Sequence, residues 1–144
     1  MSVPARLTLV TLGVADVGRA TSFYESLGWR RSSGSVDGEV TFFSLQGSAL
    51  GLFGRRALAA DANTALAASG SPGVTLVLNC DGRAEVDEVW ATWVAAGAAP
   101  VKAPEATEWG GYSSYVTDPD GHLWEIAHNP HAPNGPDGRM QLPD

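Results

Sequence analysis

The residues best suited to chemistry gather around one tight turn near the end of the sequence. Asp118-Pro119-Asp120-Gly121 is typical of a turn, because proline presets φ and glycine accepts a positive φ. Glu125 comes four residues after the glycine, on the strand that we expect to follow the turn. In an aliphatic cavity, burial would raise the pKa of this carboxyl group, which could then act as an acid, a base or an anchor for a basic ligand. The alternative interpretation is structural, with the carboxylate bonding only backbone amides or an arginine.

The three histidines add little metal-binding chemistry to Glu125. We expect His122, in the turn, to face solvent, and His131 belongs to the tail of the chain. His128 lies three residues from Glu125, so strand alternation places the two side chains on opposite faces. The sequence therefore does not predict a chelating pair here, and Cys80 is expected to be a small core residue.

Aromatic side chains are better candidates for contact with a ligand, because stacked rings in a cup suit flat or amphipathic organic molecules. The candidates are Trp109, Tyr112, Tyr115, Phe42 and Phe53. The alternative interpretation is that such rings fill the core between sheet and helix. We expect that role for Trp90 and Trp93, which follow a helical spacing.

Two similar sets of elements position these residues. In the first set, a strand over Leu7–Val14 leads to the helix-capping residue Asp16, and an apolar helical stripe runs to Gly28. The strands expected after this helix are Trp29–Ser33, Val40–Leu45 and Ala49–Phe53. The alanine-rich connector at residues 54–73 indicates a loop with a short helical piece.

The same order then returns. A strand over Val74–Cys80 precedes Asp81, and a second helical stripe ends at Gly97. The strands expected after this helix are Pro100–Ala103, Tyr112–Thr117 and Leu123–Asn129. A duplication is indicated by three matching pairs, namely Asp16 with Asp81, Gly28 with Gly97, and Gly47 with Gly121.

We therefore predict an α+β fold of two tandem βαβββ repeats, at residues 7–53 and 74–129, within one domain at residues 1–130. Side by side, the repeats would form a curved mixed sheet of about eight strands, with a concave ligand cavity and the helices on the outer face. Residues 130–144 are rich in proline and glycine, which predicts a surface or partly disordered tail.

Composition narrows the class of protein. The 144 residues include 9 basic and 16 acidic side chains, a net charge of −7, which argues against binding to nucleic acid or to an anionic membrane surface. No apolar run is long enough to span a bilayer, and Met1–Leu12 lacks a signal-peptide pattern. The single cysteine cannot form an internal disulfide, so we expect a cytoplasmic protein.

The segment Thr117–Glu125 resembles the terminal signature of the vicinal oxygen chelate superfamily, which includes glyoxalase I, bleomycin-resistance proteins and extradiol dioxygenases. Val10–Trp29 looks like the opening motif of the same superfamily, and Trp109-Gly110-Gly111-Tyr112 looks like its glyoxalase-like branch. The resemblance covers most of residues 7–130. It implies the paired-repeat fold, a small organic ligand and a homodimer.

Metal-dependent members of this superfamily hold the metal with four side chains, usually His, Gln or Glu, one on the first and one on the last strand of each repeat. Carried onto this sequence, the four positions fall on Leu9, Gly51, either Val74 or Thr75, and Glu125. Only Glu125 is a competent ligand, so we expect neither the usual divalent metal site nor another cofactor.

Two kinds of function stay open on this basis. The first is binding or sequestration of a small molecule, similar to bleomycin-resistance proteins, where an acidic protein suits a cationic drug. The second is an enzyme. It would be a glyoxalase I-like lyase or a dioxygenase with atypical metal ligands, or a metal-free isomerase or lyase that uses Glu125.

Overall fold

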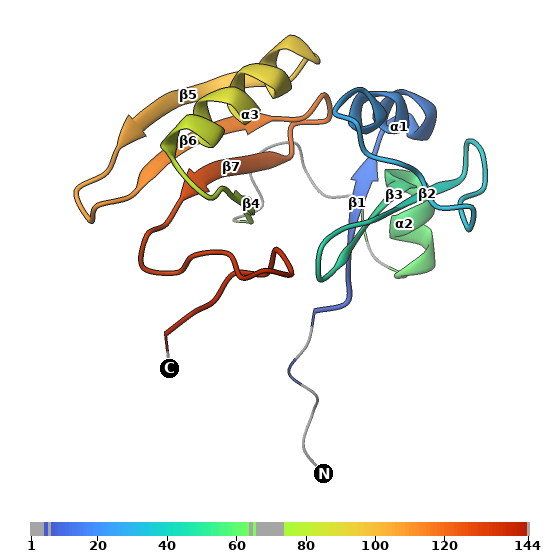
Figure 1. Cartoon of the computed structure of the whole chain (residues 1–144). Helices are drawn as coiled ribbons and strands as arrows, with labels where there is room; N and C mark the ends of the chain where they lie inside the picture. The colour runs from blue at the N-terminus through green and yellow to red at the C-terminus, as the bar shows by residue number, and fades with distance from the viewer. Residues whose placement is uncertain (1–4, 6, 64, 66–73, 144) are drawn as a thin grey trace. The chain divides into compact units, whose positions relative to one another are not determined.

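A computed structural model of the chain describes residues 5, 7–63, 65 and 74–143. They belong to two compact units, Met1–Ala67 and Ala68–Asp144, each with its own sheet (Figure 1). Of the connector expected at residues 54–73, residues 64 and 66–73 are outside the described residues. Its first part is helical, because α2 (Arg55–Asp61) begins directly after a strand. No helix among the described residues is long and apolar enough to cross a membrane.

The first unit is a three-stranded mixed sheet with one long helix. Its elements are β1 (Leu9–Val14), α1 (Val17–Ser26), β2 (Val40–Ser44) and β3 (Ala49–Gly54), followed by α2. The strand order is β1-β3-β2, with β1 parallel and β2 antiparallel to β3. A parallel pair needs a crossover connection, and α1 and β2 lie within it.

Helix α1 begins and ends where the sequence predicts. The Asp16 carboxylate accepts the Arg19 backbone N–H at 2.9 Å, and Gly28 has a positive φ of 91° just beyond the helix. The buried face of the helix carries Val17, Ala20, Thr21, Phe23 and Tyr24. On the sheet, the alternate residues Leu50 and Leu52 of β3 are buried with them, so the core of this unit lies between α1 and one face of its sheet.

The second unit is a four-stranded mixed sheet with the helix α3. Its elements are β4 (Leu76–Asn79), α3 (Arg83–Ala95), β5 (Ala99–Ala106), β6 (Tyr112–Thr117) and β7 (Leu123–His128). The strand order is β4-β7-β6-β5, with β4 parallel to β7 and the other pairs antiparallel. Trp93 of α3 contacts Trp124 of β7 with ring centroids 5.0 Å apart, so α3 covers the face of the sheet that carries Trp124.

The two units confirm the predicted α+β duplication. In each unit the first strand is parallel to the last, and the next-to-last strand is antiparallel to the last. The glycines that matched in the sequence share a backbone conformation, with φ of 91° and 114° at Gly28 and Gly97, and 91° and 86° at Gly47 and Gly121. The concave cavity expected between the repeats stays a prediction.

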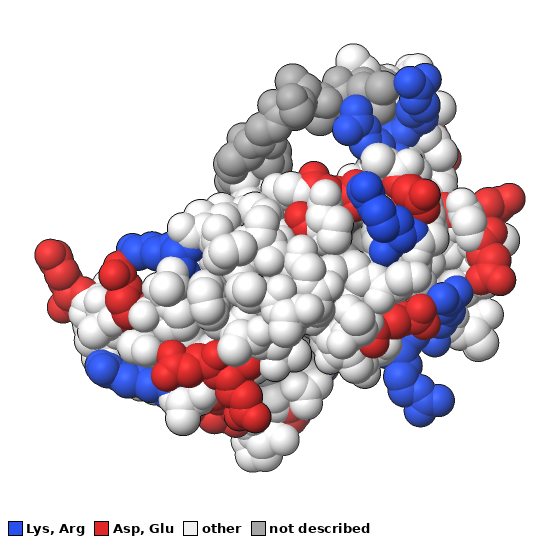
Figure 2. Space-filling view, turned by 90° about the horizontal axis from the view of Figure 1, so that it is seen from above, with Lys and Arg blue, Asp and Glu red and all other residues white. Residues whose placement is uncertain are grey.

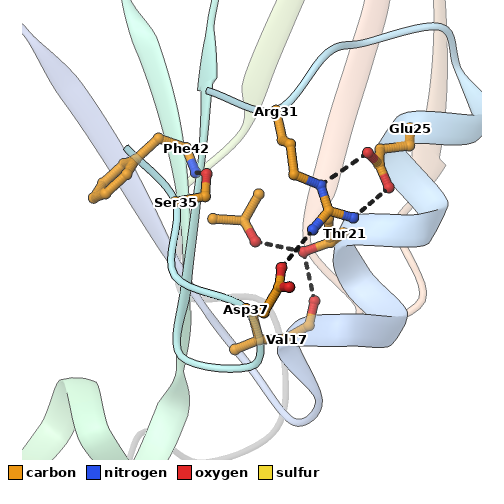
Figure 3. Close-up of polar contacts among 8 residues, drawn as sticks. Val17, Thr21, Glu25, Arg31, Ser35, Asp37 and Phe42 are labelled. Carbon is orange, nitrogen blue, oxygen red and sulfur yellow. Dashed lines mark hydrogen bonds and ion pairs between the residues drawn. The ribbon is translucent and has the colours of Figure 1, made fainter. Parts of the chain in front are cut away.

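The prediction of a strand over Trp29–Ser33 is wrong. It is reduced to one isolated bridge, Arg31 with Phe43. The reason is local: the Phe42 backbone N–H donates to the Ser35 hydroxyl at 3.0 Å, so a side chain takes the place of a strand partner (Figure 3). The Arg31 guanidinium forms ion pairs with Glu25 at 2.7 Å and with Asp37 at 2.9 Å.

The pairing of Asp81 with the helix-capping residue Asp16 does not extend to its role. Asp81 does not cap the second helix, whose N-cap is Gly82 without a side-chain bond; Asp81 instead accepts a hydrogen bond from Asn134 at 2.9 Å. After β7, residues 129–141 form a mostly exposed segment that folds back on the second unit through the Asn79 side chain, and Ala132 within it is only 2% exposed. The sequence does not predict these contacts, because they are hydrogen bonds and not an apolar pattern.

Candidate functional site

Glu125 lies on the face of the second sheet that α3 does not cover. Its direct neighbours in the ladder are Tyr115 of β6 and Val77 of β4. Side chains alternate along a strand, so Trp124 and Ile126 point to α3 while Glu125 and Ala127 point away from it. We call this side of the second sheet the Glu125 face.

The Glu125 carboxylate is held by a neighbouring hydroxyl. Ser113 is 6% exposed and donates to Glu125 Oε2 at 2.7 Å. The pKa of Tyr115 is raised, first by burial of its hydroxyl and then by the charge of Glu125 and a hydrogen bond to it. The Glu125 carboxylate, the Ser113 hydroxyl and the Tyr115 phenol therefore lie together on two adjacent strands. Together they can donate hydrogen bonds to one small ligand and accept hydrogen bonds from it.

A charged pair extends this polar set toward β5. Lys102 is the ladder partner of Tyr115, and its ammonium binds the Glu105 carboxylate at 2.7 Å. The positive charge of Lys102 acts against the pKa increase of Tyr115, which places the two groups within electrostatic reach. With two carboxylates and one ammonium, the set of Glu125, Glu105 and Lys102 carries one net negative charge.

The first unit places its candidate aromatics on the equivalent face. Phe42 pairs with Gly51, and Phe53 pairs with Val40 and Gly13, all on the side of the sheet that α1 does not cover. A Cβ atom placed on Gly51 would lie 3.4 Å from the Phe42 ring and 3.3 Å from the Thr11 hydroxyl. A side chain at position 51 would therefore make a tight contact with the Phe42 ring.

Comparison of the strand registers of the two units favours one of the two candidates for the third metal position. Gly51 pairs with Thr11, and its counterpart Glu125 pairs with Val77. Leu9 lies two residues before Thr11, so its counterpart lies two residues before Val77. That residue is Thr75, in agreement with the helix caps at Asp16 and Gly82.

The four positions therefore carry Leu9, Gly51, Thr75 and Glu125, which do not fit a divalent metal. Leucine and glycine offer no side-chain ligand atom, and threonine is a weak one. In the described part of the chain, no group of three or more His, Cys, Asp or Glu side chains lies close enough to hold a metal ion.

The remaining candidate residues are not brought together with Glu125. Tyr112 lies on the opposite face, where its hydroxyl donates to Asp87 of α3 at 2.8 Å and its ring lies under the Arg83 guanidinium. Trp109 lies at the loop between β5 and β6, 49% exposed, with its ring packed against Gly111.

The histidines also occupy structural positions. The sequence predicts that His122 faces solvent. In the structure its Nδ1 instead pairs with the buried Asp118 carboxylate at 2.8 Å. Nδ1 of His128 donates to the Cys80 carbonyl at 3.0 Å. Burial raises the pKa of the Cys80 thiol to about 12, which makes it a poor nucleophile.

Ser113 is the functional candidate that the sequence interpretation missed. Its signal was available in the turn: if Thr117 pairs with Leu123 across Asp118–His122, counting outward places Ser113 opposite Ala127 and diagonal to Glu125. Lys102 had no such signal, because β-bulges shift the register of β5 on both sides of it.

Charge on the molecular surface is mixed. Figure 2 shows acidic side chains interspersed with basic ones over the face it draws, and the sequence carries a net charge of −7.

Known proteins resemble this chain along most of its length. The profile of the Glyoxalase/Bleomycin resistance protein/Dioxygenase superfamily matches residues 6–126. A glyoxalase-related enzyme from Fulvimarina pelagi is 32% identical, with a TM-score of 0.88 over 98% of this chain and 100% of that chain. A lactoylglutathione lyase from Agrobacterium tumefaciens is 26% identical, with a TM-score of 0.68 over 88% of this chain and 95% of that one.

A family enzyme from Burkholderia phytofirmans, 24% identical, shares the fold with a TM-score of 0.75, over 86% of this chain and 98% of its own. A comparison with curated proteins gave no significant match.

Proposed function

Because the chain belongs to the glyoxalase/bleomycin resistance protein/dioxygenase superfamily, we propose that it binds a small organic molecule on the Glu125 face, without the usual divalent metal. The observation that carries this proposal is the pairing of Glu125 with Ser113 and Tyr115 on a sheet face that the unit's own helix leaves uncovered. Tyr115 supplies an aromatic surface, and the carboxylate supplies an anchor.

The metal-free part of the proposal is supported by the residues at the four family positions. Among them only Glu125 is a competent metal ligand, and any side chain at position 51 would meet Phe42 in a tight contact. Glu125 is itself engaged by Ser113 at 2.7 Å. A ligand of the protein would therefore meet an organic hydrogen-bonding site rather than open coordination positions.

The charge of the site favours a ligand with a cationic or strongly hydrogen-bond-donating group. Glu125, Glu105 and Lys102 together carry one net negative charge, and the whole chain carries −7. Negative potential concentrates positive ligands near such a face. Binding or sequestration of a cationic, aromatic-containing molecule is the function that this chemistry supports best.

A metal-free isomerase or lyase is the second candidate, and the Glu125–Ser113 contact favours it. A carboxylate held by one hydrogen bond is oriented to take a proton from a carbon next to a carbonyl group and return it elsewhere on the substrate. The Agrobacterium relative is described as a lactoylglutathione lyase, so glutathione hemithioacetals are substrates worth testing. A metal-dependent lyase or dioxygenase would need ligands other than those at the four family positions.

Two measurements test the proposal. Protein purified without chelators is analysed for nickel, zinc and iron, and we expect no stoichiometric metal. A thermal-shift screen then compares cationic glycopeptides, aromatic metabolites and glutathione hemithioacetal analogues, followed by direct titration of each compound that shifts the midpoint.

The control is a pair of carboxylate variants. Glu125→Gln should weaken binding of a cationic hit, whereas Glu88→Gln, an exposed position on α3, should not. Equal affinity in wild type and Glu125→Gln would remove this carboxylate from the site. Stoichiometric metal that is lost in Glu125→Gln would refute the metal-free assignment.

We also propose a cytoplasmic homodimer, as the family resemblance and the cysteine usage suggest. Sedimentation velocity measures the oligomeric state directly, and a monomer at micromolar concentration would contradict the dimer.

A further inference from the structure

The chain continues past β7 and folds back along the second unit. We call residues 129–141 the strap; in Figure 1 this segment runs below β7 and β4. The Gly135 N–H donates to the Arg139 carbonyl and the Gln141 N–H donates to the Pro133 carbonyl, both at 2.8 Å. These bonds close the strap into a small hairpin that also includes the bridge between Asn134 and Met140.

Asn79, at the end of β4, anchors the strap through its side chain. Its amide nitrogen donates to the Ala132 carbonyl at 3.1 Å and to Asn134 Oδ1 at 3.0 Å, and its Oδ1 accepts the Asn129 N–H at 3.2 Å. The Asn134 amide nitrogen donates in return to the Asn79 carbonyl at 2.8 Å and to Asp81 Oδ1 at 2.9 Å. The two asparagines therefore form a reciprocal latch.

The latch lies on the Glu125 face. Asn79 pairs with Ala127 in the ladder, and Val77 pairs with Glu125. Two residues along a strand span about 7 Å and point to the same side. Ala127 is 5% exposed and Ala132 of the strap is 2% exposed. The strap is therefore anchored on the Glu125 face at Asn79, two residues along β4 from Val77, the ladder neighbour of Glu125.

The strap also reaches the loop between β5 and β6. Nε2 of His131 donates to the Trp109 carbonyl at 3.2 Å. The strap thus runs from β4 to the loop that carries Trp109, across one end of the sheet. The family profile ends at residue 126, before the strap, whereas the Fulvimarina enzyme aligns with 98% of the chain. The strap therefore lies beyond the part of the chain that the family profile matches.

We infer that the strap is a wall of the ligand site: the Asn79–Asn134 latch holds it over the Asn79 end of the Glu125 face, where it limits how far a bound molecule can extend. This inference rests on the proposed function only in assigning that face to a ligand. Asn79 and Asn134 are positioning residues, because they act through the strap.

The test removes the latch with an isosteric change. Asn134→Asp abolishes both hydrogen bonds donated by Asn134 and places a carboxylate beside Asp81. Asn129→Asp is the matched control, because the Asn129 side chain accepts its hydrogen bond from His131 N–H through Oδ1, which a carboxylate preserves. Adding Asp81→Asn to Asn134→Asp removes the repulsion and should restore part of the latch.

Two readouts, neither of which needs a known ligand, are measured on the full chain. Hydrogen exchange at the Gly135 and Gln141 amides should become faster by about tenfold or more in Asn134→Asp and stay unchanged in Asn129→Asp. Coupling of glycinamide to carboxyl groups with a water-soluble carbodiimide, followed by peptide mass spectrometry, should label Glu125 faster in Asn134→Asp. Labelling of Glu88, on α3, should not change.

Each result bears on the inference. Unchanged exchange in Asn134→Asp would overturn the latch. Faster exchange without faster labelling of Glu125 would overturn the wall, because the strap would then open without exposing the face. A ligand screen without hits would count against the proposed function but would leave both results standing.

Discussion

The buried hydroxyl groups of Thr21 (α1) and Thr41 (β2) form a hydrogen bond between helix and sheet in the first unit. Its contribution to the free energy of unfolding can be measured. Their Oγ1 atoms lie 2.7 Å apart, both residues are 2% exposed, and Thr21 also donates to the Val17 carbonyl at 2.7 Å (Figure 3). A hydroxyl group has one hydrogen. Since the Thr21 hydrogen goes to Val17, Thr41 must be the donor in the bond between the two threonines.

This assignment makes the two isosteric variants unequal. Thr41→Val removes one donated bond and leaves Thr21 bonded to Val17, which should cost about 1 kcal/mol of the free energy of unfolding. Thr21→Val leaves the buried Thr41 hydroxyl without its acceptor, which should cost about 2 kcal/mol. The double variant removes both polar groups and should cost about 1 kcal/mol, well below the sum of the single changes.

Urea unfolding followed by circular dichroism measures these three values. Thr92→Val is the matched control, because Thr92 makes the same bond to a carbonyl one helical turn back, Glu88, but in an exposed position. It should change stability by less than about 0.5 kcal/mol. Additive losses, or a larger loss for Thr41→Val than for Thr21→Val, would refute the assignment of donor and acceptor.

Three further predictions concern ionisable groups. Glu125→Gln should lower the pKa of Tyr115, measured by NMR titration of the phenol ring, but leave it above its usual value because burial, the larger cause, remains. With a pKa of about 12, Cys80 should react with a thiol reagent at pH 8 roughly 1,000-fold more slowly than a free cysteine, and unfolding should restore the rate. Arg31 lowers the pKa of Glu25, so this pair stabilises the protein above the unfolded pKa and the stabilisation is lost as pH falls through the folded pKa. Arg31→Gln should reduce that acid-dependent loss, measured by thermal unfolding between pH 3 and pH 6 at low salt.

The architecture was predictable because its signals are local. The apolar stripe between Asp16 and Gly28 specifies a helix with both of its ends, and its return before Gly97 indicates the duplication. The turn at Asp118–Gly121 fixes the hairpin of β6 and β7, and with it the face on which Glu125 lies. Periodicity and turn chemistry depend on neighbours in sequence, which one chain displays in full.

The missed features depend on partners distant in sequence. Trp29–Ser33 has the composition of a strand, but a hydroxyl at Ser35 takes the N–H of Phe42 that a longer ladder would have used. In the sequence, nothing distinguishes Asn79 from an ordinary residue at the end of a strand. In the structure its side chain binds Asn134 of the strap, more than fifty residues away. Hydrogen bonds of this kind leave no period in the sequence.

Residue types and spacing by themselves determined the α+β duplication and the family resemblance, and they are the basis of the metal-free proposal, because each of these follows from local pattern or from the identity of a side chain such as Leu9 or Gly51. Only the tertiary structure paired Glu125 with Ser113, placed Tyr112 on the opposite face, brought the Phe42 ring next to Gly51 and bound the strap to Asn79. Those contacts depend on strand register and on long-range packing, in which a shift of one residue moves every side chain to the other face of the sheet.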